Sequence, residues 1–194
     1  MLKIGITGGI GSGKSFVCEI VRNKGYPVFN CDVEAKRLMV KDKATINAIS
    51  TIVGPNAYSI DIDDDGKEKR TLNRKVVADF LFANKTNAQV INDIVHPRLA
   101  KVFEQWARHY EETAEMVFLE AAILFESGFD KLVDSVILVC ADYETRIQRV
   151  MKRDNTTREM VLKRIERQVA QEELMKKNGN NKMKKRRQYN YGIF

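Results

Sequence analysis

Apolar residues change their spacing twice within the first thirty positions. Residues 2–7 form a short, mostly apolar run that stops at two glycines, as a buried strand does where it ends in a turn. From Lys14 onward the apolar residues recur at helical spacing, and Gly25 marks the end of that helix. The segment YPVFNCD predicts a second strand with Asp32 at its C-terminal end. Two strands joined by such a helix predict a right-handed crossover and a parallel sheet.

Residues 33–115 show mostly helical spacing, interrupted by a hydrophilic stretch in which Asp65 and Gly66 predict the turn of a hairpin. Pro97 is expected to be the first residue of a further helix, because proline is favoured at that position. This insert is too long for a plain crossover, and we expect it to form a subdomain that covers a substrate. The stripes that predict its two earlier helices are Leu72, Val76, Val77, Phe80 and Leu81, then Val90, Ile91 and Ile94.

Two further strands are predicted at 116–119 and 135–141, where continuous apolar runs suit a parallel sheet covered on both faces. After Asp142 the chain becomes helical and charged. Two helices separated by RDNTT are expected to form a mobile lid, and Thr156 with Glu159 matches a capping box at the start of the second. The whole pattern predicts an α/β fold with a central parallel sheet.

The chain has 194 residues and a formal net charge of +7, which raises the question of a nucleic-acid partner. Residues 175–194 hold seven lysines or arginines and no acid, which leaves 26 basic and 26 acidic residues elsewhere. We interpret this basic tail as a solvated, disordered end and expect no nucleic-acid partner. Binding of nucleic acid through the tail is the alternative.

Cys18, Cys31 and Cys140 are widely spaced and form no metal-ligand pattern, which indicates a reduced cytosolic protein. The N-terminus lacks the apolar core of a signal peptide, and no run approaches the roughly 18 apolar residues that span a bilayer. We therefore expect a cytoplasmic protein with no membrane partner. A monomer and a homo-oligomer both stay open.

The segment Gly8-x-x-x-x-Gly13-Lys14-Ser15 matches the Walker A pattern and lies between a predicted strand and a predicted helix, as that pattern requires. Its glycines let backbone N–H groups surround an anion, and the helix N-terminus adds its dipole. Lys14 is expected to reach the β- and γ-phosphates, and Ser15 to place its hydroxyl on Mg²⁺. We predict ATP with magnesium; an ordinary glycine turn that opens a helix is the alternative.

A phosphoryl acceptor needs a group that removes its proton. Asp32 is our candidate base, because it is expected at the carboxyl edge of the sheet, on the strand next to the one that leads into the glycine loop. Capping of the next helix is the alternative role. Glu120 ends another strand at the same edge and is a candidate for orienting Mg²⁺ through water.

Arg149 and Arg153 are spaced i, i+4 and share one face of the first lid helix. Arginine there is suited to neutralise charge that develops on a transferred phosphoryl group, although solvated arginines are also common on helix faces. His96, next to Pro97, is expected to be a cap or a packing group rather than a catalyst.

Several segments together resemble the dephospho-coenzyme A kinase family. They are GITGGIGSGKS, YPVFNCDVEAKRL, LNRKVVADFLF, INDIVHPRL, LEAAILFESGFD, and RIQRVMKRD followed by RIERQ. The resemblance runs from Met1 to about Glu173 and implies a three-layer P-loop kinase fold. Its parts would be a core at 1–34 and 116–142, a helical substrate-binding insert at about 35–115, a lid at about 143–174 and an atypical tail at 175–194.

The resemblance also implies an activity. The γ-phosphoryl group of ATP would pass to the ribose 3′-hydroxyl of dephospho-CoA, the last step of coenzyme A synthesis. The family base corresponds to Asp32, and Arg74 and His96 fall in the segments taken to bind this substrate. The ATP-binding segment corresponds to Gly11, Ser12, Gly13, Lys14, Ser15 and Phe16.

The chain departs from the family pattern at several positions. Phe16 stands where Thr is usual, Glu120 where Asp is common, and Arg146 where Gln is frequent. At the C-terminus a family strand and final helix are replaced by KKNGNNKMKKRRQYNYGIF, which indicates a reading-frame change, a truncation or a genuine variant. A damaged, inactive kinase is therefore an alternative to the active enzyme.

Two other functions share the glycine loop. A kinase of the same fold that acts on nucleoside monophosphates or small metabolites is the nearest alternative, but the HPRL and LFESGFD segments favour dephospho-CoA. A GTPase would carry an NKxD motif that reads the base, and residues 84–87 lack its Asp.

Overall fold

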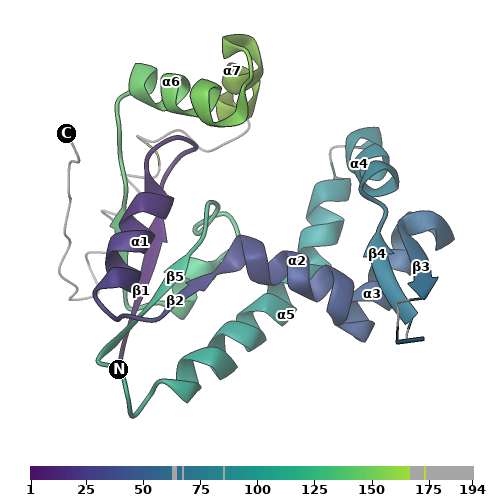
Figure 1. Ribbon diagram of the computed structural model, residues 1–194, viewed down its shortest axis with the longest axis horizontal. Helices are drawn as coiled ribbons and strands as arrows, with labels where there is room; N and C mark the ends of the chain where they lie inside the picture. The colour runs from purple at the N-terminus through teal and green to yellow at the C-terminus, as the bar shows by residue number, and fades with distance from the viewer. Residues whose placement is uncertain (63–64, 67, 85, 167–172, 174–194) are drawn as a thin grey trace. The chain divides into compact units, whose positions relative to one another are not determined.

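The computed structural model describes residues 1–62, 65–66, 68–84, 86–166 and 173. The chain divides into two compact units, which we describe separately (Figure 1). The sheet unit consists of Met1–Asn30 and Glu104–Phe194, and the helical unit consists of Cys31–Phe103.

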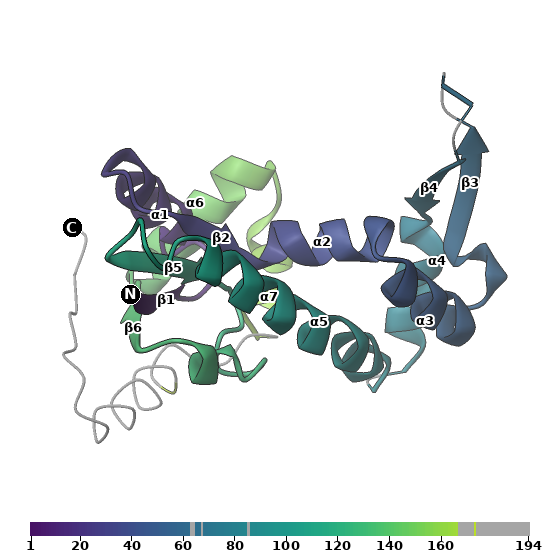
Figure 2. The same ribbon diagram turned by 90° about the horizontal axis from the view of Figure 1, so that it is seen from below.

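A parallel four-stranded sheet forms the centre of the sheet unit, in the order β2-β5-β1-β6. Ile6 of β1 and Asn30 of β2 are both in register with Glu120 of β5, so these three strands end at the same edge (Figure 1, Figure 2). The elements of this unit are β1 Leu2–Thr7, α1 Lys14–Asn23, β2 Val28–Asn30, β5 Met116–Glu120, η2 Phe129–Leu132, β6 Ser135–Leu138, α6 Tyr143–Asp154, α7 Arg158–Glu166 and the last residues of α5 Asn87–His109.

The predicted strand order is wrong in one respect, because β5 lies between β1 and β2. The side chains of β5 are buried at every position after Met116, which suits a strand covered on both faces. β2 has only three residues and follows Pro27, whose carbonyl accepts a hydrogen bond of 2.9 Å from the Phe118 N–H. A short strand entered through a proline is typical of a sheet edge.

Helices cover both faces of the sheet. Cys18 of α1 packs with Phe118 of β5 in one apolar cluster. Phe29 of β2 is in register with Leu119, which neighbours Phe118 in the chain and therefore faces the opposite side. On that side the ring of Trp106, near the end of α5, lies 5.3 Å from the ring of Phe29. The prediction of an α/β fold with a parallel sheet between helices is confirmed.

The two helices predicted after Asp142 are present as α6 and α7. Asp142 caps α6 by accepting a hydrogen bond of 2.8 Å from the Thr145 N–H. Asn155 ends that helix in the left-handed conformation, with φ +46°, and the Thr156 N–H donates back to α6. Thr156 therefore completes the end of α6, and the hydroxyl of Thr157 accepts from Met160 at the start of α7. The predicted capping box of Thr156 and Glu159 is therefore wrong: Thr157 caps α7, and Glu159 binds Lys163 instead.

The helical unit is built from helices and one hairpin. Its elements are α2 Cys31–Lys41, α3 Lys43–Val53, η1 Pro55–Ala57, β3 Tyr58–Ile62, β4 Glu68–Leu72, α4 Arg74–Ala83 and the first part of α5. The predicted hairpin is confirmed, since β3 and β4 pair antiparallel on either side of Asp65 and Gly66. Leu72, predicted on a helix, ends β4, and Asn73 caps α4 through its side chain. The core includes buried Ile49, Ala57, Ile91 and Val95.

Two predicted boundaries in the helical unit are wrong. Asp32 does not end a strand: β2 stops at Asn30, and Asp32 lies in the first turn of α2. Pro97 does not open a helix, because α5 runs through it without a break. A proline inside a helix removes one backbone donor and crowds the preceding turn. Nearby, the Arg98 guanidinium donates to the Ile94 carbonyl at 2.9 Å and so adds a hydrogen bond beside this irregular turn.

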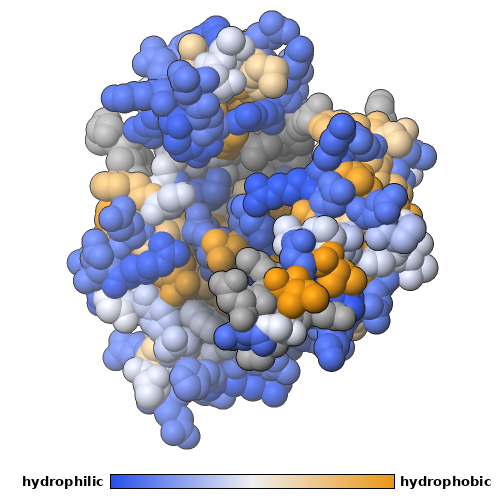
Figure 3. Space-filling view, turned by 45° about the vertical axis from the view of Figure 1, so that its right-hand side comes forward, coloured by the Kyte–Doolittle hydropathy of each residue, from blue (hydrophilic) through white to orange (hydrophobic). Residues whose placement is uncertain are grey.

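Apolar side chains on the surface are scattered. The view in Figure 3 shows small hydrophobic groups on a mostly hydrophilic face. Exposed large apolar residues include Phe16, Val33, Ile62 and Phe82. None of the helices in the described part of the chain is both long and apolar enough to cross a membrane. The predicted basic tail at 175–194 lies outside the described residues.

Candidate active site

The glycine loop between β1 and α1 has the geometry of an anion cradle. Gly13 stands at the N-cap of α1 in the left-handed region, with φ +103°, a conformation that glycine adopts without strain. No side chain of the described residues caps this helix end. The first N–H groups of α1, with the positive end of the helix dipole, thus suit a bound phosphate.

Lys14 and Ser12 add side chains to this cradle. The Lys14 ammonium donates to the carbonyl of Gly8, and lies 3.4 Å from that of Gly9. The Ser12 hydroxyl is buried and has no hydrogen-bond partner among the described residues. A buried polar group of this kind calls for a partner, and a phosphate oxygen would supply one. The residues present therefore fit a nucleotide polyphosphate.

Ser15 and Phe16 follow in the first turn of α1, and both side chains are exposed. Ser15 is the residue whose hydroxyl is predicted from the sequence to bind Mg²⁺. Phe16 is 57% exposed. A hydrogen bond from this residue to phosphate would come from its backbone N–H, because the ring has no donor. The departure from Thr at this position leaves that N–H unchanged.

Glu120 is held at the edge of the sheet by its neighbours. Its Oε2 accepts a hydrogen bond of 2.8 Å from the Asn30 side chain and lies 3.8 Å from a guanidinium nitrogen of Arg22. Burial, and then the negative charge of Glu120 and a hydrogen bond to it, raise the pKa of the Cys18 thiol to about 12. The Glu120 carboxylate is thus oriented beside the strand that leads into the glycine loop.

The described residues contain no group of three or more His, Cys, Asp or Glu side chains placed to hold a metal ion. Mg²⁺ in phosphoryl-transfer sites usually takes only one or two protein oxygens and fills its other positions with water and phosphate. Ser15 and Glu120 are compatible with a site of that kind.

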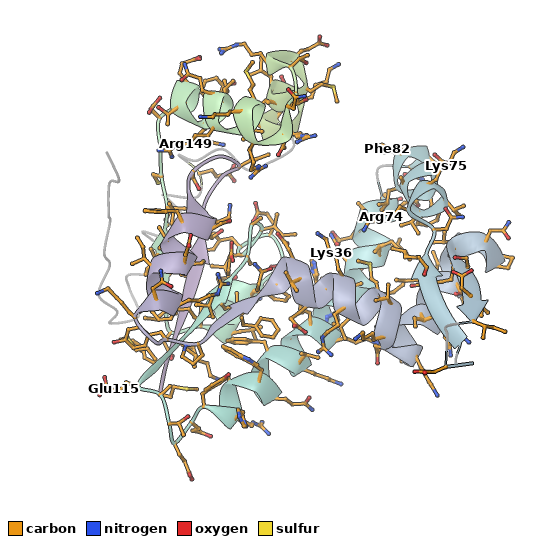
Figure 4. All side chains as sticks on the ribbon, viewed as in Figure 1. Lys36, Arg74, Lys75, Phe82, Glu115 and Arg149 are labelled. Carbon is orange, nitrogen blue, oxygen red and sulfur yellow. The ribbon has the colours of Figure 1, made fainter. Side chains whose placement is uncertain are left out.

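The two arginines predicted to act in a lid, Arg149 and Arg153, differ in what they contact. An Nη atom of Arg149 lies 3.5 Å from the Ser12 carbonyl, so α6 places this residue at the glycine loop (Figure 4). Arg153 instead donates to Asp154 at 2.7 Å, and Arg164 binds the same carboxylate at 2.6 Å. The structure brings Arg149 to the loop and leaves Arg153 in a surface ion-pair network.

The remaining predicted residues belong to the helical unit. Asp32 is exposed in the first turn of α2. Arg74 is exposed at the first position of α4 (Figure 4). His96 is half-buried within α5, where burial lowers the pKa of its imidazole and Asp93 partly opposes the shift. The neutral imidazole is therefore favoured at pH 7.

Arg146 is a residue that sequence reasoning did not assign to the site. It is 6% exposed, and its Nε donates to the Ile10 carbonyl of the glycine loop at 2.9 Å. The one signal in the sequence was that arginine replaces a residue that is frequently glutamine in the resembling family. That signal did not indicate a contact with the loop.

The chain matches the family model for dephospho-CoA kinase over residues 2–181. It is also 40% identical to a dephospho-CoA kinase of Bacteroides fragilis (strain YCH46) over 172 residues, which cover 89% of this chain and 79% of that protein. The chain belongs to the dephospho-CoA kinase family. Its membership makes it a kinase, and the predicted family and enzyme class are confirmed.

Solved structures share the fold of this chain. The crystal structure of TT1252 from Thermus thermophilus has a TM-score of 0.74 at 32% identity and covers 91% of this chain and 85% of that one. The dephospho-CoA kinase from Campylobacter jejuni has a TM-score of 0.60 at 22% identity, with 99% and 89% covered, which supports the shared fold. Membership of the dephospho-CoA kinase family decides against the GTPase and against the other small-molecule kinases.

Proposed function

We propose that this chain transfers the γ-phosphoryl group of ATP to the ribose 3′-hydroxyl of dephospho-CoA, giving coenzyme A and ADP in the last step of coenzyme A synthesis. The observation that carries the proposal is the uncapped N-terminus of α1 behind the glycine loop, in a member of the dephospho-CoA kinase family. We further propose that the enzyme acts in the cytoplasm.

Binding of ATP rests on the residues of the loop. The N–H groups from Gly11 to Phe16 would surround the phosphates, with the Ser12 hydroxyl as a further donor and Lys14 on the β- and γ-phosphates. Ser15 would hold Mg²⁺ directly and Glu120 through water. When bound, Mg²⁺ neutralises charge on the phosphate oxygens.

Asp32 is the proposed general base. It lies two residues after Asn30 in the chain. The Asn30 side chain is fixed by its hydrogen bond to Glu120. In the reaction the 3′-oxygen attacks the γ-phosphorus, the bond from that phosphorus to the β–γ bridging oxygen breaks, and the hydroxyl proton passes to the Asp32 carboxylate. ADP carries the bridging oxygen away.

Arg149 is the proposed lid arginine. Its position against the Ser12 carbonyl brings a guanidinium to the loop that would hold the phosphates. A cation there would neutralise charge that develops on the transferred group, and closure of the two lid helices would exclude water as a competing acceptor. We include Arg153 as a weaker candidate, since its partner is Asp154.

The second substrate is assigned to the insert at about 35–115. Arg74 is an exposed cation and suits the phosphate groups of dephospho-CoA. His96 is half-buried and favours its neutral form, so it would act as a hydrogen-bonding group rather than as a charge.

The test is a coupled assay of ADP release from ATP and Mg²⁺, with and without dephospho-CoA, on the whole chain. Release that depends on dephospho-CoA, with AMP and shikimate inactive, is the expected result. No release from a chain that still binds ATP would contradict the proposal and favour a kinase damaged at its C-terminus. Restoring a family-like C-terminus would then recover activity if damage is the cause.

A further inference from the structure

Arg146 lies against the glycine loop, although it is neither part of the loop nor one of the predicted lid arginines. Among the described residues, Arg146 and Glu120 are the charged residues with less than a tenth of their surface exposed. Burying a guanidinium is costly unless specific contacts compensate for the lost hydration. The hydrogen bond of 2.9 Å from its Nε to the Ile10 carbonyl is one such contact.

Two glycines of the loop are shaped around this arginine. A side chain at Gly9 would collide with the guanidinium of Arg146, and a Cβ at Gly11 would lie 2.5 Å from the Arg146 carbonyl oxygen. One residue of α6 therefore meets the loop twice, with its side chain at Gly9 and with its backbone at Gly11. A side chain at either position would therefore require Arg146 or the loop to shift.

The contacts continue along α6. Ile10 packs against a cluster formed by buried Ile147 and Val150 of α6 and Val161 of α7. Three residues after Arg146, the guanidinium of Arg149 lies near the Ser12 carbonyl. Helix α6 thus contacts the loop through two polar contacts, an apolar contact at Ile10 and the close approaches of Arg146 to Gly9 and Gly11.

We propose that Arg146 is a positioning residue for nucleotide binding, which fixes the glycine loop in its phosphate-binding conformation and sets α6 so that Arg149 reaches the loop. The proposal rests on the proposed function only in taking ATP and ADP as the nucleotides. Arg146 acts through Gly9, Ile10 and Gly11, whose N–H groups and backbone path determine how well the phosphates are held.

The positive charge of Arg146 should also favour nucleotide binding. Burial lowers the pKa of its guanidinium, so the surroundings disfavour the positive charge. A polyphosphate bound in the loop would favour that charge, because opposite charges attract. Nucleotide binding and the charged form of Arg146 should therefore support each other.

Three substitutions separate these contributions. Arg146→Met removes the donor and the charge, Arg146→Gln keeps a donor without the charge, and Arg146→Lys keeps the charge without the planar guanidinium. Lys152→Gln is the matched control, because Lys152 is an exposed cation on the same helix. Each whole-chain variant is tested for its dissociation constant for ADP and Mg²⁺ by calorimetry, and for the KM values of ATP and dephospho-CoA.

We expect Arg146→Met to weaken ADP binding and raise the KM of ATP at least about tenfold, with the KM of dephospho-CoA within twofold of the unmodified chain, in line with the loss of a charge-assisted contact. Arg146→Gln and Arg146→Lys should each recover part of the affinity, and Lys152→Gln should match the unmodified chain. A residue with only a structural role would lower the fraction of folded enzyme, and hence kcat, without raising the KM of ATP alone.

The proposal is overturned if Arg146→Met binds ADP within twofold of the unmodified chain, or if kcat falls while both KM values stay constant. Should Arg146→Met fail to fold, the Gln and Lys variants decide, after thermal unfolding shows that they are folded: the proposal is overturned if both bind ADP as tightly as the unmodified chain. Failure of the proposed function looks different. In that case the Arg146 variants still bind ADP more weakly, but dephospho-CoA does not stimulate ADP release from the unmodified chain.

Discussion

The side-chain amide of Asn30 donates a hydrogen bond of 2.8 Å to Glu120, and this contact joins the ends of β2 and β5. Two residues of α1 contact the same carboxylate: Arg22 by an ion pair and Cys18 by a hydrogen bond. Glu120 is therefore held from the strand and from the helix that follows the glycine loop. A carboxylate with fixed orientation at the carboxyl edge of a parallel sheet is well placed to act on a ligand bound there.

Removing the charge of Glu120 should change the magnesium dependence of the kinase. If Glu120 orients Mg²⁺ through water, Glu120→Gln will raise the Mg²⁺ concentration for half-maximal activity several-fold, as loss of an outer-sphere metal partner commonly does. Asn30→Ala should shift it in the same direction by less, because the carboxylate remains but is no longer held. The measurement is ADP release against Mg²⁺ concentration at saturating ATP.

Glu115→Gln is the matched control for that experiment. Glu115 is exposed and precedes β5 at the end opposite Glu120 (Figure 4). An equal shift in the Glu115 and Glu120 variants would mean that the general charge of the protein, and not a specific contact, sets the magnesium dependence.

Asp32→Asn and Lys14→Ala should separate chemistry from binding. Replacing the proposed base is expected to lower turnover at least about a hundredfold while the affinity for ADP stays nearly unchanged. Lys14→Ala should instead weaken nucleotide binding as well as turnover, because the ammonium next to the Gly8 carbonyl is lost from the cradle. Calorimetry and steady-state ADP release measure the two effects.

Asp79→Asn serves as the control for Asp32, since Asp79 is an exposed aspartate in the same helical unit. Near-normal turnover of Asp32→Asn would contradict the base assignment. A large loss in both aspartate variants would point to a general effect of charge on the helical unit.

The local pattern predicted those parts of the molecule that depend on neighbouring residues in the chain. The strand before Gly8, the helix from Lys14 and the buried strand that ends at Glu120 follow from spacing and glycine positions alone. Strand order did not, because pairing of β1 with β5 joins segments more than a hundred residues apart. Periodicity indicates which residues of a strand are buried, but not which other strand it pairs with.

Single residues show the same limit of prediction from local sequence patterns. Pro97 is favoured at helix starts, yet tertiary packing of a long apolar stripe carries α5 through it. Arg146 has the polarity of a surface residue, and its burial results from a close approach of α6 to the loop that no pattern within either segment reveals. Arg149 and Arg153 have equal spacing on one helix face, so only their partners distinguish them.

The thiol of Cys18 should make the fold sensitive to high pH. Burial, with a smaller effect of Glu120, raises its pKa to about 12, so the folded chain holds this proton more tightly than the unfolded chain. The stabilising effect is fully present below the pKa of an ordinary thiol, about 8.5. It is lost as the pH rises from there toward 12, because the unfolded chain gains a thiolate that the folded chain does not accommodate.

Urea unfolding of the unmodified chain and of Cys18→Ala at pH 7, 9 and 10 tests this expectation. The free energy of unfolding should fall more steeply with pH for the unmodified chain. Tyr58, whose pKa is raised to about 12 by burial, contributes in the same sense above its ordinary pKa of 10 but is common to both proteins. Equal slopes for the two proteins would contradict a proton held at Cys18.

Arg149 and Arg153 provide the sharpest comparison within one helix. Arg149 contacts the loop through Ser12, whereas Arg153 is bound to Asp154. Arg149→Gln should therefore reduce kcat at least about tenfold, since removal of a single donor to a developing charge typically costs that much or more. Arg153→Gln should cause a smaller loss, which reflects only a weakened end of α6.

Single-turnover measurements at saturating ATP and dephospho-CoA compare the two variants without interference from product release. A larger loss in the Arg153 variant would mean that the lid rearranges on binding so that Arg153, and not Arg149, reaches the phosphoryl group.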